Sequence, residues 1–172
     1  MQLLTPVGDT LCIREVMATS GSGTEGTWEA VLGFTPPDVD TPATVRAFER
    51  SAKDGSPVNV VDRDVVITTE RPPIFVYQPS CGDRVAPGDP LFVKGRALVF
   101  EAQFSLDLRN AAGEVVLTQQ ATAQSGSEES NFDATITIPA DLPAGFYDLV
   151  AYDNSAQDGS IQNEFPVQIE LR

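Results

Sequence analysis

The clearest pattern in this chain is the alternation of apolar and polar residues in short runs, separated by turns rich in Gly, Pro, Asp and Asn. Alternation predicts β-strands because successive side chains of a strand point to opposite faces of a sheet. No long run has the 3.6-residue period of an amphipathic helix, so little helix is expected. Residues 98–108 alternate most regularly, and their apolar members are predicted to face a core: Leu98, Phe100, Ala102, Phe104, Leu106 and Leu108.

An internal repeat organises these runs. Residues 51–56 (SAKDGS) return as residues 155–160 (SAQDGS), and from Trp28 to Ile67 the two copies align at a constant offset of 104. Upstream of Trp28 the offset is 105, which places Leu3 on Leu108. Nothing in the chain matches residues 73–104, so the first copy is predicted to begin about where the third strand of the second copy runs.

The first copy is predicted to hold strands at residues 11–19, 27–34, 44–50 and 58–67. In the second of these, one face would carry Trp28, Ala30, Leu32 and Phe34. The copy has few aromatic residues with which to build a core. We therefore expect it to be unstable alone and to depend on the second copy or on residues outside this sequence.

The second copy is predicted to hold seven strands, within residues 74–77, 91–95, 98–108, 114–123, 132–138, 146–153 and 161–171. Seven short strands with alternating faces are typical of an immunoglobulin-like sandwich, and Tyr147 stands where a tyrosine corner would form. The predicted fold class is all-β, with tandem immunoglobulin-like β-sandwich domains of which the first is N-terminally incomplete. The predicted domains are residues 1–67 and 74–172, joined by a linker at 68–73.

Charge and composition exclude several functions. The chain has a net charge of −14 and no histidine. Such an acidic chain repels nucleic acid and anionic membrane surfaces. Without histidine it can form neither a Ser-His-Asp nor a Cys-His nucleophile, and zinc loses its usual ligand. No glycine-rich phosphate-binding loop is present. We therefore predict no catalytic residue, no metal site and no cofactor.

The sequence contains no predicted membrane span, because no apolar run reaches the roughly 18–20 residues that cross a bilayer. Residues 1–20 lack the features of a signal peptide. Since Met1 falls inside a predicted domain, the natural polypeptide is expected to begin upstream.

Four residues stand out as a candidate surface for a ligand or partner. Glu101 is a charged residue among apolar neighbours, and Phe146 and Tyr152 share the face opposite to that of Tyr147. Asp158 lies in an oxygen-rich loop, residues 153–159, which could hold calcium or could be a hairpin turn in which the Asp caps its own backbone. The turn is favoured, because the first copy has Arg50 at the corresponding position of the loop and an arginine opposes a bound cation.

The two cysteines have no metal-binding spacing. Cys12 aligns with the strand residue Leu117, so the favoured interpretation is a small apolar side chain packed in a sheet. A bridge to Cys81 is the alternative.

Residues 74–171 resemble the immunoglobulin-like domain of bacterial spore germination proteins, Gmad2. The resemblance rests on the order and spacing of Pro79, Gly82-Asp83, Val85, Pro90, Val93-Lys94-Gly95-Arg96-Ala97, Phe100-Glu101-Ala102, Gly113, Phe132, Gly145, Ser155 and Asp158-Gly159. Residues 3–67 resemble the rear of a second such domain through Gly8, Trp28, Ser51 and Asp54-Gly55. The resemblance implies a binding or spacer module of exported or membrane-anchored envelope proteins, without catalytic residues. Sporulation is not implied.

These observations predict a non-catalytic, extracytoplasmic module that acts by protein–protein contact, with an envelope protein as the partner. The alternative is a carbohydrate-binding module for wall polymers, with Phe146 and Tyr152 as the residues to examine. Most aromatic residues fall on inward positions, which counts against the alternative. The sequence predicts no oligomeric state.

Overall fold

The computed structural model describes residues 1–21 and 23–172, and the chain forms two compact units. Unit 1 comprises Met1–Leu32 and Pro37–Thr69, and unit 2 comprises Gly33–Pro36 and Glu70–Arg172. The boundary after Thr69 falls inside the predicted linker. The assignment of Gly33–Pro36 to unit 2 has no counterpart in the sequence-based prediction.

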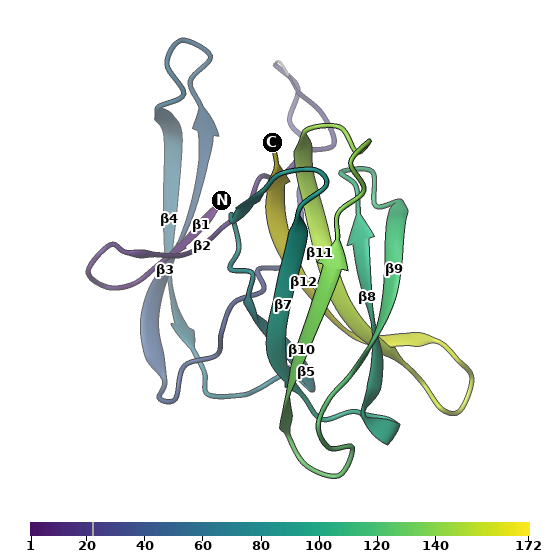
Figure 1. The fold of residues 1–172 in the computed structure, drawn as a ribbon. Coiled ribbons are helices and arrows are strands. Elements are labelled where there is room, and N and C mark those ends of the chain that lie inside the picture. The colour runs from purple at the N-terminus through teal and green to yellow at the C-terminus, as the bar shows by residue number, and fades with distance from the viewer. Residues whose placement is uncertain (22) are drawn as a thin grey trace. The chain divides into compact units, whose positions relative to one another are not determined.

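Unit 2 is a sandwich of two sheets, which Figure 1 shows in teal, green and yellow. The smaller sheet has the order β10-β7-β5, with bounds Ser130–Thr137, Pro90–Ala97 and Ile74–Gln78. The larger sheet has the order β6-β12-β11-β8-β9, with bounds Arg84–Val85, Ile161–Leu171, Gly145–Asn154, Gln103–Arg109 and Val115–Thr122. All pairs are antiparallel except β6 with β12. The predicted immunoglobulin-like sandwich is thereby confirmed for this copy.

The core of unit 2 lies between the two sheets and takes apolar side chains from both. Phe104 and Phe132 meet edge to face, with ring centroids 4.6 Å apart. Gly95 lies beside them on β7, and a Cβ there would overlap the Phe132 ring and the Phe75 carbonyl oxygen. The large Phe132 side chain thus requires a residue without a side chain on the neighbouring strand.

The tyrosine corner is confirmed. The Tyr147 hydroxyl donates a hydrogen bond to the Pro143 carbonyl oxygen at 3.0 Å, which ties β11 to the crossover before it.

Unit 1 is a single four-stranded antiparallel sheet with the order β2-β1-β3-β4. These strands are Thr10–Ile13, Gln2–Leu4, Thr41–Arg50 and Pro57–Ile67. In unit 2 the corresponding strands, β9-β8-β11-β12, lie in the same order within the larger sheet.

The two sheets share their pairing register. Leu3 pairs with Cys12 and Val45, just as the equivalent Leu108 pairs with Leu117 and Leu149. The pairing of β3 with β4 shifts register between Ala47 and Glu49, and that of β11 with β12 shifts between Ala151 and Asp153.

An asparagine in the left-handed backbone region accompanies each of these shifts. Asn59 has φ of 53° and Asn163 has φ of 57°. Asparagine is among the few non-glycine residues that adopt this conformation readily. The offsets of 104 and 105 that were found in the sequence therefore relate residues of like backbone geometry.

The predicted strand at residues 27–34 is wrong, because these residues adopt no regular secondary structure. Their counterpart, β10, is hydrogen-bonded within its sheet to β7 alone. The described part of unit 1 contains no counterpart of β7. A strand without a neighbour leaves its backbone groups unpaired, so alternation alone does not produce one here.

The predicted strand at residues 98–108 is correct only in its second half. Strand β8 begins at Gln103, and the 3₁₀ turn η1 (Phe100–Ala102) precedes it, with Glu101 and Ala102 at φ of 55° and 59°. Leu98 and Phe100 are exposed rather than inward, and Val99 is buried instead. Likewise β2 ends at Ile13, short of the predicted end at Thr19.

Candidate functional site

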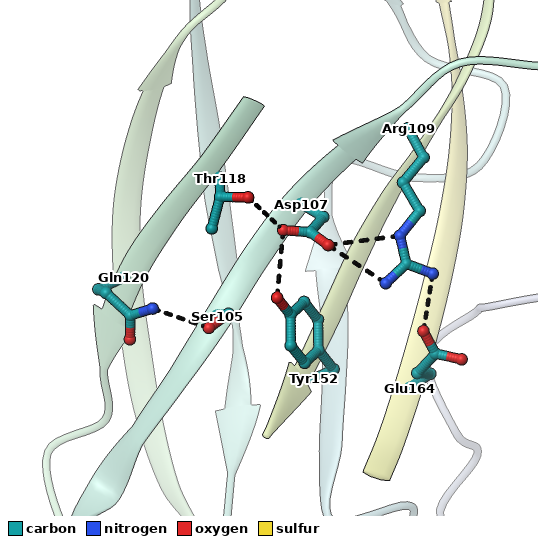
Figure 2. Close-up of polar contacts among 7 residues, drawn as sticks. All are labelled: Ser105, Asp107, Arg109, Thr118, Gln120, Tyr152 and Glu164. Carbon is teal, nitrogen blue, oxygen red and sulfur yellow. Dashed lines mark hydrogen bonds and ion pairs between the residues drawn. The ribbon is translucent and has the colours of Figure 1, made fainter. Parts of the chain in front are cut away.

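A closed network of polar side chains lies on the side of the larger sheet of unit 2 that faces away from its core (Figure 2). Asp107, on β8, is 2% exposed, and its Oδ1 accepts hydrogen bonds from Thr118 at 2.7 Å and from the Tyr152 hydroxyl at 3.3 Å. Its Oδ2 accepts from Arg109 Nη2 at 3.2 Å and from Nε at 3.4 Å. A buried carboxylate is costly unless it is paired and hydrogen-bonded, and here both oxygens are.

Arg109 connects this carboxylate to a second one. Its Nη1 donates to Glu164 Oε1 at 2.7 Å, and its guanidinium lies 5.7 Å from the centre of the Tyr152 ring. Burial lowers the pKa of Arg109, but the hydrogen bonds that it donates to Glu164 and Asp107 outweigh burial and leave that pKa above its ordinary value. The guanidinium therefore remains charged and holds both carboxylates in place.

The network is suited to fixing strands rather than to chemistry. It joins β8, β9, β11 and β12, and the Asp107 carboxylate that accepts from the Thr118 hydroxyl is buried and also held by Arg109 and Tyr152. Unit 1 does not repeat it, because Gln2, Leu4 and Phe48 stand at the positions of Asp107, Arg109 and Tyr152. The network is thus a property of the second copy alone.

The four residues singled out from the sequence do not form one surface. Tyr152 is buried and bonded to Asp107, so its ring is not an open platform for a sugar. Phe146 is partly exposed near the start of β11. Glu101 is exposed in η1, where its backbone rather than strand alternation directs its side chain. A role for these residues in binding stays a prediction.

Asp158 lies at the tip of the β11–β12 hairpin in a turn that it caps itself. Its Oδ1 accepts from the Ser160 backbone N–H at 3.0 Å and from the Ser160 hydroxyl at 2.7 Å. These hydrogen bonds lower its pKa below the ordinary value. Asp54 and Ser56 form the same contacts at 3.0 and 2.6 Å in unit 1. The geometry is that of the hairpin turn favoured from the sequence.

Unit 1 contains a feature that the sequence analysis missed, an apolar cavity of about 400 Å³ on one face of its sheet. Most of its lining is apolar, and Glu15, Glu49 and Asn59 contribute polar groups. The apolar lining residues are Met1, Val16, Ala18, Trp28, Ala47, Phe48 and Val61.

The cavity lies where unit 2 has its core. Six of its lining residues align with core residues of unit 2, and the pairs are Met1 with Leu106, Val16 with Ala121, Ala18 with Ala123, Trp28 with Phe132, Ala47 with Ala151 and Val61 with Phe165. In unit 2 the smaller sheet covers this side. The cavity could have been predicted from the sequence. The repeat alignment shows no counterpart in the first copy for residues 73–104, which include β5 and β7, so the first copy lacks the strands that cover this side in unit 2.

The polar pair at the rim of the cavity has a structural role. Asn59 Nδ2 donates to Glu49 Oε2 at 3.0 Å, and the equivalent Asn163 Nδ2 donates to Asp153 Oδ1 at 2.8 Å. Each pair fixes the irregularity in its hairpin. The distinctive chemistry of the cavity is therefore its apolar lining.

Neither cysteine is a free thiol, because Cys12 and Cys81 are both disulfide-bonded. Cys12 is buried, as the favoured interpretation of a packed apolar side chain expected, but that interpretation is wrong in preferring packing to a bridge, because the residue is disulfide-bonded. Within residues 1–21 and 23–172, no helix is long and apolar enough to cross a membrane, and no group of three or more potential metal-ligating side chains is found.

Comparison with known families gives one match. Residues 73–160 match the model of Gmad2, the immunoglobulin-like domain of bacterial spore germination. Among curated proteins, none matches the chain. The matched residues cover half of the chain and lie in unit 2.

Proposed function

The chain belongs to the Gmad2 family of immunoglobulin-like domains, and from this premise we propose that it is a non-catalytic, extracytoplasmic module that acts by protein–protein contact. The proposed contact surface is the face of the unit 1 sheet that carries Ala47, Val61 and Val65, together with Trp28. We call it the open face.

One observation carries this proposal. Trp28, Val61 and Val65 are 49%, 51% and 37% exposed, whereas their equivalents Phe132, Phe165 and Ile169 are 1%, 7% and 0% exposed. The same positions are thus core in one copy and surface in the other. Contiguous exposed apolar surface on a folded protein commonly marks a site of protein contact.

The edge of the same sheet supports the proposal. Strand β4 is the last strand of its sheet, and ten of its eleven residues are exposed, Ile67 being half-buried (Figure 1). An exposed edge presents unpaired backbone groups to which an extended segment can add as a further strand. Charged residues at 62–64 interrupt the apolar positions of β4, which limits non-specific pairing of the edge.

The disulfide-bonded state of both cysteines supports the proposed location, because disulfides persist in oxidising compartments outside the cytoplasm. The absence of histidine from the chain and the satisfied hydrogen bonds of Asp107 support a non-catalytic role.

The half-exposed indole of Trp28 favours a second candidate, carbohydrate binding, since sugars stack on exposed aromatic rings. The apolar lining of the cavity and the structural role of the Glu49–Asn59 pair support protein contact over this candidate.

A photo-crosslinking amino acid placed at position 61 or 65 tests the proposal, with position 7 as the control. Val7 is more exposed than either but lies in a turn. In a bacterial envelope extract, we expect a discrete protein adduct from positions 61 and 65 and none from position 7. Equal adducts from all three positions, or none from positions 61 and 65, would refute protein contact at the open face.

Titration of the chain with soluble cell-wall glycan fragments, followed by the fluorescence of Trp28, tests the second candidate. A saturable change with glycan in the absence of protein adducts would replace the first proposal by the second.

A further inference from the structure

We infer that the partner contributes an extended segment that occupies, against unit 1, the place that β7 holds in unit 2. The segment is apolar on the side that meets the open face and basic on the other side. This inference rests on the proposed function and specifies the chemistry of the partner.

The apolar requirement follows from what β7 does in unit 2. Its residues Leu91, Val93 and Ala97 are buried, and they belong to the core cluster that also contains Phe132 and Phe165. In unit 1 the equivalents of these two phenylalanines, Trp28 and Val61, line the open cavity. A segment that fills the cavity therefore needs medium-sized apolar side chains at alternate positions, as β7 has.

The structure also indicates a small residue opposite Trp28. In unit 2 Phe132 pairs directly with Gly95, and a Cβ at Gly95 would overlap the Phe132 ring. Trp28 is larger than Phe132 and holds the same position in the repeat. The segment should therefore have glycine at the position that faces Trp28.

The basic requirement follows from charge complementarity. In unit 2 Lys94 Nζ lies 3.6 Å from Asp133, and Arg96 Nη1 lies 2.6 Å from Glu129. Unit 1 has Glu29 at the position of Asp133, and Glu25 lies three residues before Trp28, as Glu129 lies three residues before Phe132.

No basic side chain of the described residues pairs with Glu25 or Glu29. Glu29, at the position of Asp133, and Glu25, one residue from the position of Glu129 in the repeat alignment, are thus available to a basic segment. Attraction between opposite charges would select such a segment and orient it on the sheet.

The backbone of unit 1 is prepared for this pairing. Residues 27–32 align with β10, which becomes a strand by hydrogen bonding to β7 from Ser130–Ala97 to Thr137–Pro90. In unit 1 these residues lack such a neighbour and adopt no regular structure. An added segment would supply the missing hydrogen-bonding groups, so residues 27–32 should become a strand when it binds.

The test uses the full chain and a synthetic peptide with the sequence of residues 89–98, DPLFVKGRAL, as the probe. Trp28 is the sole tryptophan of the chain, so its fluorescence reports on this cavity alone. Binding removes the indole from water, and we expect a saturable shift of its emission to shorter wavelength. Hydrogen exchange of residues 27–32 should slow at the same peptide concentrations.

Three control peptides examine the three requirements separately. Val93→Asp removes the apolar contact, Gly95→Ile introduces a side chain opposite Trp28, and Lys94→Glu with Arg96→Glu reverses the charge. Each should weaken binding at least about tenfold, which corresponds to about 1.4 kcal/mol. Added salt should weaken binding of the parent peptide and not that of a variant with Lys94→Gln and Arg96→Gln.

The chain variant Val61→Glu is the matched control on the protein side. Val61 is half-exposed, so the substitution should leave the far-ultraviolet circular dichroism spectrum unchanged while it abolishes the fluorescence shift. If this variant unfolds, Glu25→Gln with Glu29→Gln serves instead and should reduce the affinity for the parent peptide at least fivefold.

The inference is overturned if the parent peptide gives no saturable shift up to about 1 mM, or if the parent and Val93→Asp peptides bind equally. Protein adducts at positions 61 and 65 without peptide binding would overturn the segment chemistry and leave the proposed function standing. The absence of both would overturn the two together.

Discussion

Replacing Asp107 by Asn tests whether the polar network stabilises unit 2 through its buried charge. The substitution keeps the size of the side chain and leaves an oxygen to accept from Thr118 and Tyr152. Its amide N–H₂ would then face the donors of Arg109, so both hydrogen bonds from the guanidinium are lost and two sets of donors oppose each other.

The magnitude follows from the geometry of these contacts. Hydrogen bonds to charged groups contribute about 1.5–3 kcal/mol each when well formed. The two from Arg109 are long, at 3.2 and 3.4 Å, and the half-exposed Glu164 remains to pair with the guanidinium. We therefore expect a loss of about 2–3 kcal/mol in the free energy of unfolding of unit 2, at or just below the low end of the range of about 3–5 kcal/mol for breaking a buried ion pair.

Urea unfolding of the full chain, followed by tyrosine fluorescence and circular dichroism, measures this loss. With a urea dependence of about 1–3 kcal/mol/M, the transition of unit 2 should move down by about 1 M or more with unchanged slope. Because Asp107 and Arg109 are in contact, the double variant with Arg109→Met should show a coupling energy of about 1–2 kcal/mol.

The control is Asp62→Asn, which removes a carboxylate that pairs with Arg46 at 2.8 Å on the surface of unit 1. Exposed pairs of this kind are screened by solvent, so no measurable change is expected. A loss below about 0.5 kcal/mol for Asp107→Asn, within the range of ordinary surface substitutions, would refute the reasoning. It would mean that water satisfies the guanidinium as well as Asp107 does.

Three further predictions concern unit 2. Tyr147→Phe removes the hydrogen bond to the crossover and should cost about 1 kcal/mol in urea unfolding, and an unchanged midpoint would contradict a stabilising tyrosine corner. Gly95→Ala forces a Cβ against the Phe132 ring and should cost about 1–3 kcal/mol or more by the same measurement, whereas a neutral result would mean that the core is loosely packed there. The pKa of Asp158 is lowered in the fold, so its contribution to stability is present above the unfolded pKa near 3.8 and is lost as pH falls through the folded pKa. Asp158→Asn should therefore flatten the acid limb of a thermal-stability profile, and an unchanged limb would argue against the capped turn.

The sequence predicted the second copy well because its information is local and repeated. Asn59 and Asn163 mark the register irregularities and are related by the offset of 104 found in the sequence. Both copies keep asparagine there because few other residues with a side chain adopt the left-handed conformation readily. The tyrosine corner at Tyr147 was also predicted correctly, because it requires only a hydrogen bond to the crossover just before it in the chain.

The failures arose where neighbours outside the segment decide the structure. Residues 27–34 alternate as a strand does, but a strand also needs a partner, and alternation carries no information about one. Alternation likewise assigned Leu98 and Phe100 inward, although the positive φ of Glu101 and Ala102 breaks the period there. The burial of Asp107 on the face away from the core was not predicted, since a polar residue at an outward position is ordinarily solvated.

The self-capped hairpin tips have a consequence for the order in which the chain folds. Each tip closes through contacts within six residues, Ser51 N to Ser56 O and Ser155 N to Ser160 O, both 2.8 Å long. Closing so short a loop is fast, and hairpins form in about 1–10 μs, before distant segments meet. Both copies should thus acquire the same two-stranded nucleus early. In unit 2, β5 and β7 must later pack against this hairpin from upstream in the chain, which is a slower step. The described residues of unit 1 contain no strands that would do the same.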